Sequence, residues 1–451
     1  SVTNSGGQVT PGLSPGILTI TGNYTQSGTG VLNVEIGGAT VGTEYDRLAV
    51  TGTATLGGTL NVSLINGFTP VAGNTFQILT FGSRSGDFAT KNGLRPASNM
   101  YLRPGYNAND LTLTTVVGMY WYNPVSGNWN TAANWSLERV PVATDDVPIA
   151  VNGTYTVTQD VDATVASLAL GGGTGTPTLS GSGRTLTVNG ASTIAANGVL
   201  SLSGSTLAGS GTLTNQGTLK SLNSSVVNAP LVNQGLVHVE NQGGHAINGA
   251  FSNQAGATLR VKGSESGDGT TLTIANGFTN AGAIEIAYGF SYRNAILNVT
   301  NGTLTNAASG TIMSVQGGSA GTVNLNAQLD NQGTITVGSS PLSINKPSAA
   351  HANSGAISVT TNDLTLTQSG TSPSFTNAGT INVPSGRKLT VTGGTFAHNS
   401  GTLGGSGTLH FSGATVNLAP DLTNGRTISL DGSVLNGPGI LTNQGTLNSL
   451  N

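Results

Sequence analysis

The chain has 451 residues with a formal net charge of −3, and 7% of its residues are charged, against about 25% in average domains. It has no cluster of lysine and arginine, which disfavours nucleic-acid partners, and no apolar run near the roughly 18 residues of a membrane span. Cysteine is absent, which excludes disulfides and cysteine-based metal sites. Glycine contributes 68 residues without a collagen period, and alternating β-branched runs favour an ordered all-β fold with little or no α-helix.

Residues 1–117 alternate short apolar runs with glycine-rich turns. The runs include ILTITG at Ile17, VLNVEIGG at Val31, LAVTG at Leu48 and TLNVSLI at Thr59. Their spacing predicts a β-strand-repeat module, either sandwich-like or built of wide solenoid coils. The acids Glu44, Asp46 and Asp87 are isolated in turns, whereas Ca²⁺ needs about six to eight oxygen ligands, so we expect these acids to cap turns.

Three stretches of this module carry a resemblance. SPGILTITGNYTQSGTGVLNVEIGG, EYDRLAVTGTATLGGTLNVSLINGF and FQILTFGSRSGDF resemble the strand-repeat module of large bacterial surface proteins and autotransporter passengers. The resemblance implies an extracellular or cell-surface structural role for the module. It implies no catalytic residues.

All three tryptophans lie in the segment 118–171, at Trp121, Trp129 and Trp135. This segment resembles a tryptophan-containing segment found between strand-repeat modules in bacterial surface proteins. Two roles are open for the rings. They could stack on sugars as a glycan-binding platform, or they could plug a junction by burying large aromatic surfaces, and we favour the plug.

One phrase, apolar-x-Asn-x-Gly-x-apolar-x-apolar, recurs through residues 172–451. Its asparagines are Asn215, Asn233, Asn253, Asn280, Asn306, Asn331, Asn353, Asn377, Asn399 and Asn443. Most neighbours are 18 to 27 residues apart, which is the length of one turn of a parallel β-helix. We therefore predict a β-solenoid of about twelve stacked coils over this range.

The phrase predicts which side chains face inward. We expect each Asn to occupy a turn and to join a ladder of stacked amides, and the Gly two residues later to permit a positive φ. Apolar residues four and six positions after the Asn then point inward, and the residue between them points outward. That outward position varies across coils, with Lys220, His238, Glu285, Thr336, Ser358, Asn382 and Asn448. Such variation differs from the repeated threonine face of an ice-binding solenoid.

An enzymatic β-helix would bring carboxylates together with Lys, Arg or His on neighbouring coils. The acids are scattered along the sequence, at Glu240, Glu265, Asp268, Glu285, Asp330, Asp363, Asp421 and Asp431. The five histidines have no metal-ligand spacing, and they are His238, His245, His351, His398 and His410. Asp145 and Asp146 form the one candidate Ca²⁺ pair, and we predict no cofactor.

The phrases FTNAGTI and LTNQGTL resemble the repeats of filamentous-haemagglutinin-type exoproteins and autotransporter passengers. This resemblance implies a right-handed parallel β-helix in a secreted, bacterial, extracellular or cell-surface protein.

A longer match aligns residues 200–223 with residues 428–451. Because neither end shows a polar cap, we expect open strand edges that suit head-to-tail stacking or tandem copies of the same unit.

The sequence therefore predicts a non-enzymatic extracellular stalk, fibre or adhesin module. Its expected partners are copies of itself and cell-surface or matrix polysaccharide. A glycan-binding module that uses the tryptophan segment is the first alternative, and a carbohydrate-active β-helix enzyme is the second.

Overall fold

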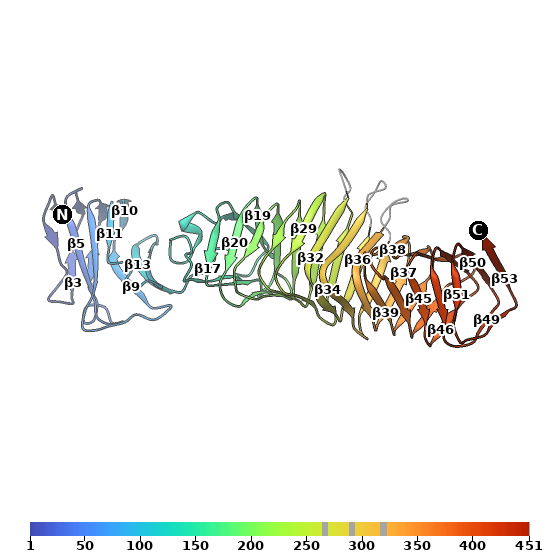
Figure 1. Ribbon diagram of the computed structural model, residues 1–451. Helices are drawn as coiled ribbons and strands as arrows, with labels where there is room; N and C mark the ends of the chain where they lie inside the picture. Colours follow the sequence, from blue (N-terminus) through green and yellow to red (C-terminus); the bar gives the residue numbers. More distant parts are fainter. Residues whose placement is uncertain (264–268, 288–293, 316–322, 451) are drawn as a thin grey trace. The chain divides into compact units, whose positions relative to one another are not determined.

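A computed structural model of the chain describes residues 1–263, 269–287, 294–315 and 323–450 (Figure 1). Almost every described element is a β-strand, and a single turn of 3-10 helix, η1 (Ala132–Asn134), is the one helix among these residues. The chain divides into two units, the first of residues 1–123 and 131–140 and the second of residues 124–130 and 141–451. Together the units contain about 20 solenoid turns.

The first unit is a stack of wide coils with three strands each. One parallel sheet contains β1 (Val2–Asn4), β4 (Tyr24–Gln26), β7 (Thr53–Leu56) and β10 (Ser83–Gly86). A second contains β2 (Gln8–Val9), β5 (Val31–Ile36), β8 (Thr59–Leu64) and β11 (Thr90–Asn92). The third begins with β3 (Ile17–Ile20), β6 (Arg47–Val50) and β9 (Thr75–Thr80). Of the two arrangements open from the sequence, residues 1–117 thus adopt solenoid coils.

A hairpin ends the parallel stacking of the third sheet. It consists of β12 (Met100–Tyr106) and β13 (Asp110–Val117), which pair antiparallel with each other. Strand β13 also pairs antiparallel with β9, so it occupies the edge where another parallel coil would otherwise add.

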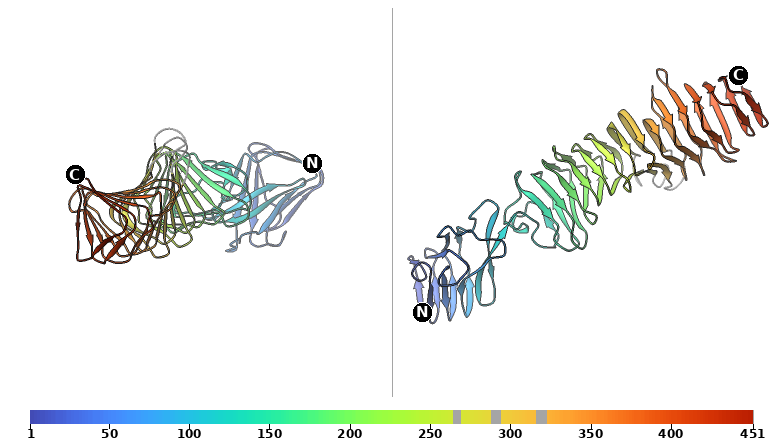
Figure 2. Two further views of the ribbon diagram at one scale, coloured as in Figure 1. Left: turned by 90° about the vertical axis from the view of Figure 1, so that its right-hand side faces the viewer. Right: turned by 90° about the horizontal axis from the view of Figure 1, so that it is seen from below.

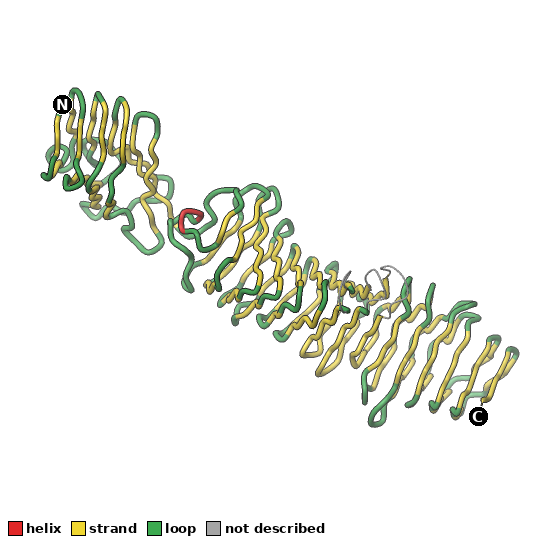
Figure 3. Tube along the Cα trace, turned by 90° about the horizontal axis from the view of Figure 1, so that it is seen from above, coloured by secondary structure: helices red, strands yellow, loops and turns green. Residues whose placement is uncertain are grey.

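The second unit has three faces of stacked parallel strands (Figures 2 and 3). Face 1 contains β14 (Gly127–Asn128), β16 (Tyr155–Gln159), β19 (Pro177–Ser182), β22 (Val199–Ser203), β25 (Thr218–Leu222), β28 (Leu236–Glu240), β31 (Thr258–Lys262), β33 (Ala283–Ala287), β35 (Thr311–Val315), β37 (Thr334–Val337), β40 (Ala356–Val359), β43 (Thr380–Asn382) and β46 (Thr402–Gly404). The stacking therefore begins at β14, inside the segment 118–171 that the sequence set apart as a junction.

Faces 2 and 3 belong to one continuous sheet. Face 2 contains β17 (Ala163–Val165), β20 (Thr185–Val188), β23 (Thr206–Ala208), β26 (Val226–Val227), β29 (Gly243–Ile247), β38 (Leu342–Asn345), β41 (Leu364–Thr367), β44 (Lys388–Thr392), β47 (Thr408–Ser412), β50 (Thr427–Asp431) and β53 (Thr446–Leu450). Face 3 contains β15 (Asp146–Ile149), β18 (Ser167–Leu170), β21 (Ser192–Ile194), β24 (Leu213–Asn215), β27 (Leu231–Asn233), β30 (Phe251–Asn253), β39 (Ala350–Asn353), β42 (Ser374–Asn377), β45 (Thr395–His398), β48 (Thr415–Leu418) and β51 (Val434–Asn436). The long strands β32 (Thr270–Asn280), β34 (Ala295–Asn306) and β36 (Val323–Asn331) run across both faces.

Aliphatic side chains fill the interior in aligned rows. On face 1 the register places one inward residue of each strand above the last, from Leu179 and Leu200 through Ile284, Ile335 and Ile381. Each of these five side chains is 1% exposed or less. Because side chains alternate along a strand, burying one row in this way leaves the polar row beside it outward, which accounts for the period-two pattern of the sequence.

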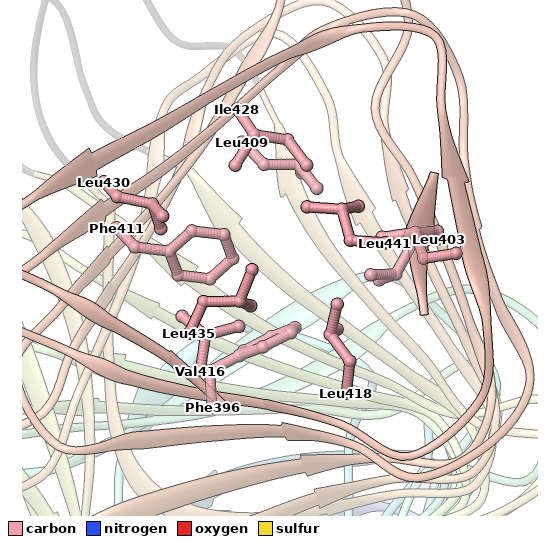
Figure 4. A pocket seen from close by; sticks show the side chains of 11 residues that line it. Phe396, Leu403, Leu409, Phe411, Val416, Leu418, Ile428, Leu430, Leu435 and Leu441 are labelled. Atoms are coloured by element: carbon pink, nitrogen blue, oxygen red, sulfur yellow. The ribbon is translucent and has the colours of Figure 1, made fainter. Parts of the chain in front are cut away.

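The same apolar interior continues through the C-terminal coils. Figure 4 shows side chains from several strands there pointing into one space, among them Phe396, Leu409, Phe411 and Ile428. Burying each such side chain contributes about 1.5–3 kcal/mol, so the stack is stabilised along its length and not at one centre.

Face 1 ends at β46 because an arginine covers its edge. The guanidinium of Arg426 donates hydrogen bonds to the carbonyl oxygens of Leu403 and Gly404 at 2.6 and 2.7 Å. The following strands, β49 (Leu422–Asn424) and β52 (Leu441–Asn443), pair with each other in a separate two-stranded sheet.

Candidate functional site

A row of buried asparagines follows the ends of the face 3 strands, and we call it the amide row. Its members are Asn215, Asn233, Asn253, Asn280, Asn306, Asn331, Asn353 and Asn377. In each of the first seven, the side-chain Nδ2 donates to the Oδ1 of the next asparagine at 2.6–2.8 Å. Most also donate to a backbone carbonyl at the start of a face 1 strand, as Asn215 does to Leu236 at 2.9 Å. From Asn233 to Asn353 each buried amide both donates and accepts within the row, which makes its burial tolerable. The Oδ1 of Asn215, the first member, has no hydrogen-bond partner among the described residues.

Two of the ten asparagines expected in this row lie elsewhere. Asn399 is exposed. The stretch from Phe396 to the next face 1 strand is one residue longer than the equivalent stretch from Phe375, so Asn399 does not reach the position of the row. The register instead places His398 above Asn377, with its Nδ1 3.0 Å from the Asn377 Nδ2. Asn443 belongs to a separate pair, in which its Oδ1 accepts from Asn424 at 2.7 Å.

The Asn and Gly of the repeated phrase do not have the turn conformations that we expected from the sequence. The asparagines end strands, and none of the amide row has a positive φ. The glycines that follow, such as Gly333, Gly355 and Gly379, also have ordinary φ angles. A Cβ on Gly355 would lie 2.1 Å from the carbonyl oxygen of Gly333, and one on Gly379 would lie 2.1 Å from that of Gly355. Close stacking of coils, and not left-handed backbone, is what requires glycine there.

The structure buries all three tryptophans. Trp121, Trp129 and Trp135 are 1%, 1% and 0% exposed. In the first unit Trp121 and Trp135 meet edge to face, with ring centroids 5.0 Å apart, whereas Trp129 belongs to the second unit. Stacking on a sugar needs an exposed ring face, so this burial supports the packing role of the segment.

Charged contacts hold residues 131–140 on the first unit. The carboxylate of Glu138 lies 3.2 Å from a guanidinium nitrogen of Arg103 and accepts from the Tyr101 hydroxyl at 2.5 Å. Arg95 donates to the carbonyl oxygens of Leu137 and Glu138. Burial and the Glu138 carboxylate together raise the pKa of Tyr101, so the phenol remains a proton donor to Glu138 at neutral pH.

The candidate Ca²⁺ pair is engaged in ordinary turn and strand contacts. The Asp145 carboxylate accepts from the Val142 backbone N–H at 2.8 Å, and that of Asp146 accepts from the Ser167 hydroxyl at 2.6 Å. Within the described part of the chain, no three His, Asp or Glu side chains are arranged to hold a metal ion. Glu265 and Asp268 lie outside the described residues.

The acids of the first unit serve turns and strand ends. Asp46 is fully buried and accepts from the backbone N–H groups of Gly16 and Glu35 at 2.7 and 2.9 Å. Burial is the largest influence on this group and raises the pKa of Asp46. A hydrogen bond from the Thr40 side chain, together with those from the backbone N–H groups of Thr40 and Ala39, lowers the pKa of Glu44. Asp87 pairs with Lys91 at 2.7 Å.

One group of ionisable side chains gathers on the outward side of face 1, over the consecutive strands β25, β28, β31 and β33. We call it the charged cluster, and it consists of Lys220, His238, Glu240, Arg260, Lys262 and Glu285. Four of these lie in one register row, in the order Lys220, His238, Arg260 and Glu285. The Arg260 Nε lies 2.6 Å from the Glu285 carboxylate.

A second carboxylate, that of Glu240, lies beside His238 on the same strand, β28. The Glu240 carboxylate is 3.4 Å from the His238 Nε2 and 3.9 Å from the Lys262 Nζ. Partial burial lowers the pKa of His238, and the neighbouring cations lower it further, whereas Glu240 raises it. The imidazole is therefore neutral at pH 7, and three cations face two carboxylates in the cluster.

Sequence reasoning found only part of this cluster. It placed Lys220, His238 and Glu285 outward but described the acids as scattered and did not single out Arg260 or Lys262. The phrase does not predict an outward position for Arg260, because the turn after Asn253 is two residues longer than in the phrase. Aligning TLRVK with the neighbouring strand AIEIA would have revealed the row.

The other histidines lie mostly inside the solenoid. His245, His351 and His398 are 1%, 3% and 2% exposed, whereas His410 is half-buried on the outward side of face 2. The Leu329 backbone N–H donates to the His351 Nδ1 at 3.3 Å, and burial lowers the pKa of His351 to about 4. Burial also lowers the pKa values of His245 and His398.

Searches with this chain against protein-family models, curated proteins and solved structures found no match. Among the described residues, no helix has the length and apolar character needed to cross a membrane. The described chain is thus a β-solenoid repeat protein.

Proposed function

We propose that this protein is a non-enzymatic structural component of the bacterial cell surface or extracellular space, serving as a stalk, fibre or adhesin module. The observation that carries the proposal is the amide row. Eight consecutive coils join their buried amides into one hydrogen-bonded line, and the inward row of face 1 that contains Ile284 is apolar throughout the same coils. This arrangement gives length and resistance to unfolding, which a scaffold needs.

Resemblance of the repeated phrase to filamentous-haemagglutinin-type exoproteins supports the location. The β-solenoid is the architecture that such a resemblance implies, although solenoids also serve other purposes. Detection of the protein on intact cells of the organism that carries the gene, by antibody labelling and by sensitivity to added protease, tests this location. Retention of the protein inside intact cells would contradict it.

We propose copies of the chain as one partner. The last coil presents apolar side chains to solvent, with Val434, Ile440 and Leu447 exposed by 56%, 65% and 44%. A coil stacked on it, from a further segment or from a second copy, would bury these side chains and pair the edge of β53. Sedimentation of the purified chain at several concentrations tests self-association, which predicts mass rising with concentration.

The enzymatic alternative is tested directly. The purified chain is incubated with a panel of plant, bacterial and animal polysaccharides, and new reducing ends or unsaturated products are measured. No product above a heat-treated control is the expected result. Turnover that a substitution of Glu240 or Glu285 abolishes would replace the structural proposal with an enzymatic one.

A further inference from the structure

The charged cluster contains groups that the stability of the solenoid does not require. In coils below and above it, the same outward row of face 1 carries small or uncharged residues, including Ser180, Ser201, Met313, Thr336 and Ser358. Across four consecutive coils the row changes to Lys, His, Arg and Glu. A strand face needs no charge to stack, so this local change points to a ligand.

Two cations of the cluster keep donor groups available to solvent. Lys220 forms no ion pair among the described residues, and Arg260 contacts Glu285 through its Nε alone, which leaves the two terminal guanidinium nitrogens for other acceptors. The Arg260 side chain is 39% exposed. The two cations lie one coil to either side of His238, so their strands are about 10 Å apart, twice the spacing of neighbouring strands.

We propose that the charged cluster binds an anionic polysaccharide that lies along the stack of coils, with its acid groups held by Lys220 and Arg260. A pyranose unit is about as long as the strand spacing, so acid groups on alternate units meet the two cations. Beside them, Thr218 and Thr258 present hydroxyls in the neighbouring outward row. The arginine fork and the lysine point charge suit carboxylate and sulfate groups alike.

The two carboxylates of the cluster favour a sparsely charged polymer. A nucleic acid brings a charge to every nucleotide, and a protein that binds it usually neutralises many phosphates with lysine and arginine. Here Glu240 lies on β28, the strand between those of Lys220 and Arg260, and Glu285 lies one coil beyond Arg260, so both carboxylates would repel such a polymer. A polysaccharide with one acid group in every second unit places its charges beside Lys220 and Arg260 and its neutral units beside the carboxylates.

The test measures the affinity of the full chain for hyaluronan, which has one carboxylate for every two sugar units, for κ-carrageenan, which has one sulfate for every two, for uncharged dextran and for a single-stranded oligodeoxynucleotide. We expect binding to at least one of the two anionic glycans, weakening as salt increases, and none to dextran. The first two ligands distinguish carboxylate from sulfate as the bound group. Failure of both anionic glycans to bind, equal binding to dextran, or tighter binding to the oligonucleotide would overturn the proposal.

Substitutions locate the site. Lys220→Gln and Arg260→Gln should each weaken binding by about tenfold, the effect of losing one charged hydrogen bond. Lys388→Gln removes the same charge from face 2, in β44, and should change affinity by less than about twofold. An equal loss in the Lys388 variant would mean that binding follows net charge and not the cluster.

Glu285→Gln provides a change in the opposite direction. It releases the Arg260 guanidinium and removes a negative charge, so affinity should increase by a few fold. If the cluster only stabilises the fold, this variant should unfold more readily and bind no better. Circular dichroism of each variant ensures that the coils are intact, and unchanged affinity in a folded Glu285→Gln protein would count against the site.

Discussion

Asn377 and His398 form the last contact of the amide row, in which the asparagine Nδ2 donates to the histidine Nδ1 at 3.0 Å. In the next coil the same position holds Leu418, which can neither donate nor accept. The histidine thus terminates a polar line inside an apolar interior. It can do so only as the neutral tautomer with its hydrogen on Nε2, because Nδ1 must accept.

Replacement of His398 by leucine should destabilise the protein by about 1–3 kcal/mol, because it removes one of the two acceptors of the buried Asn377 Nδ2 and leaves only the Gly379 carbonyl oxygen. His398→Asn keeps an acceptor in the row and should cost less. Urea unfolding at pH 7 measures both. Equal losses in the two variants would show that volume matters at this position and the hydrogen bond does not.

Acid should destabilise the solenoid through His351. Burial lowers the pKa of His351 to about 4, so between pH 6.5 and 4 the unfolded chain binds a proton that the folded chain does not. The stability is therefore complete above pH 6.5 and falls as the pH drops toward 4, by about 3 kcal/mol for this residue. Thermal unfolding at pH 7.5 and pH 4.5 measures the loss. In His351→Gln the difference between the two pH values should shrink, and an unchanged difference would assign it to other groups.

Two neighbouring residues on one strand should lose very different amounts of stability when each is truncated to alanine. Ile335 is fully buried, and Ile335→Ala should cost about 2–5 kcal/mol through lost burial and the cavity left behind. Thr336 points outward beside it, and Thr336→Ala should change stability by less than about 0.5 kcal/mol. Chemical unfolding of the pair tests the assigned facing. Comparable losses would mean that the strand register is different.

The stacked glycines should not tolerate a methyl group. A Cβ on Gly355 would lie 2.1 Å from the Gly333 carbonyl oxygen, so Gly355→Ala must push two coils apart and should cost several kcal/mol, more than the roughly 1–3 kcal/mol of ordinary overpacking. Gly244 has an ordinary φ, and a methyl group added there would meet no atom within 4 Å, so it serves as the matched control. Thermal unfolding decides between them, and a harmless Gly355→Ala would remove the steric explanation.

Alternation and repetition made much of the fold predictable. Inward residues such as Ile284 and Ile357 follow from the period of two, and the coil length follows from the distance between asparagines. The burial of the asparagines themselves was less predictable. Asn is common in turns, so its sequence context favoured a turn, whereas the coils above and below provide the partners that allow it to be buried.

Variable coil length limited what the sequence could show about side-chain neighbours. Residues that stack in space are 18 residues apart for Lys220 and His238 but 25 apart for Arg260 and Glu285. A fixed period therefore misses the charged cluster. The phrase LTNQGTL shows the same limit, because at 213–219 its first strand joins face 3, whereas at 441–447 it joins the separate two-stranded sheet.

Every bond of the amide row has the same sense, with the donor in one coil and the acceptor in the coil that follows it in sequence. The amide row therefore has a direction, and it can be lengthened or shortened only by whole coils. Deleting the 22 residues that lead from Asn331 to Asn353 would rejoin one donor to one acceptor and leave the remaining row in register. A gene that lengthens or shortens by such units changes the reach of its product without having to redesign the interior.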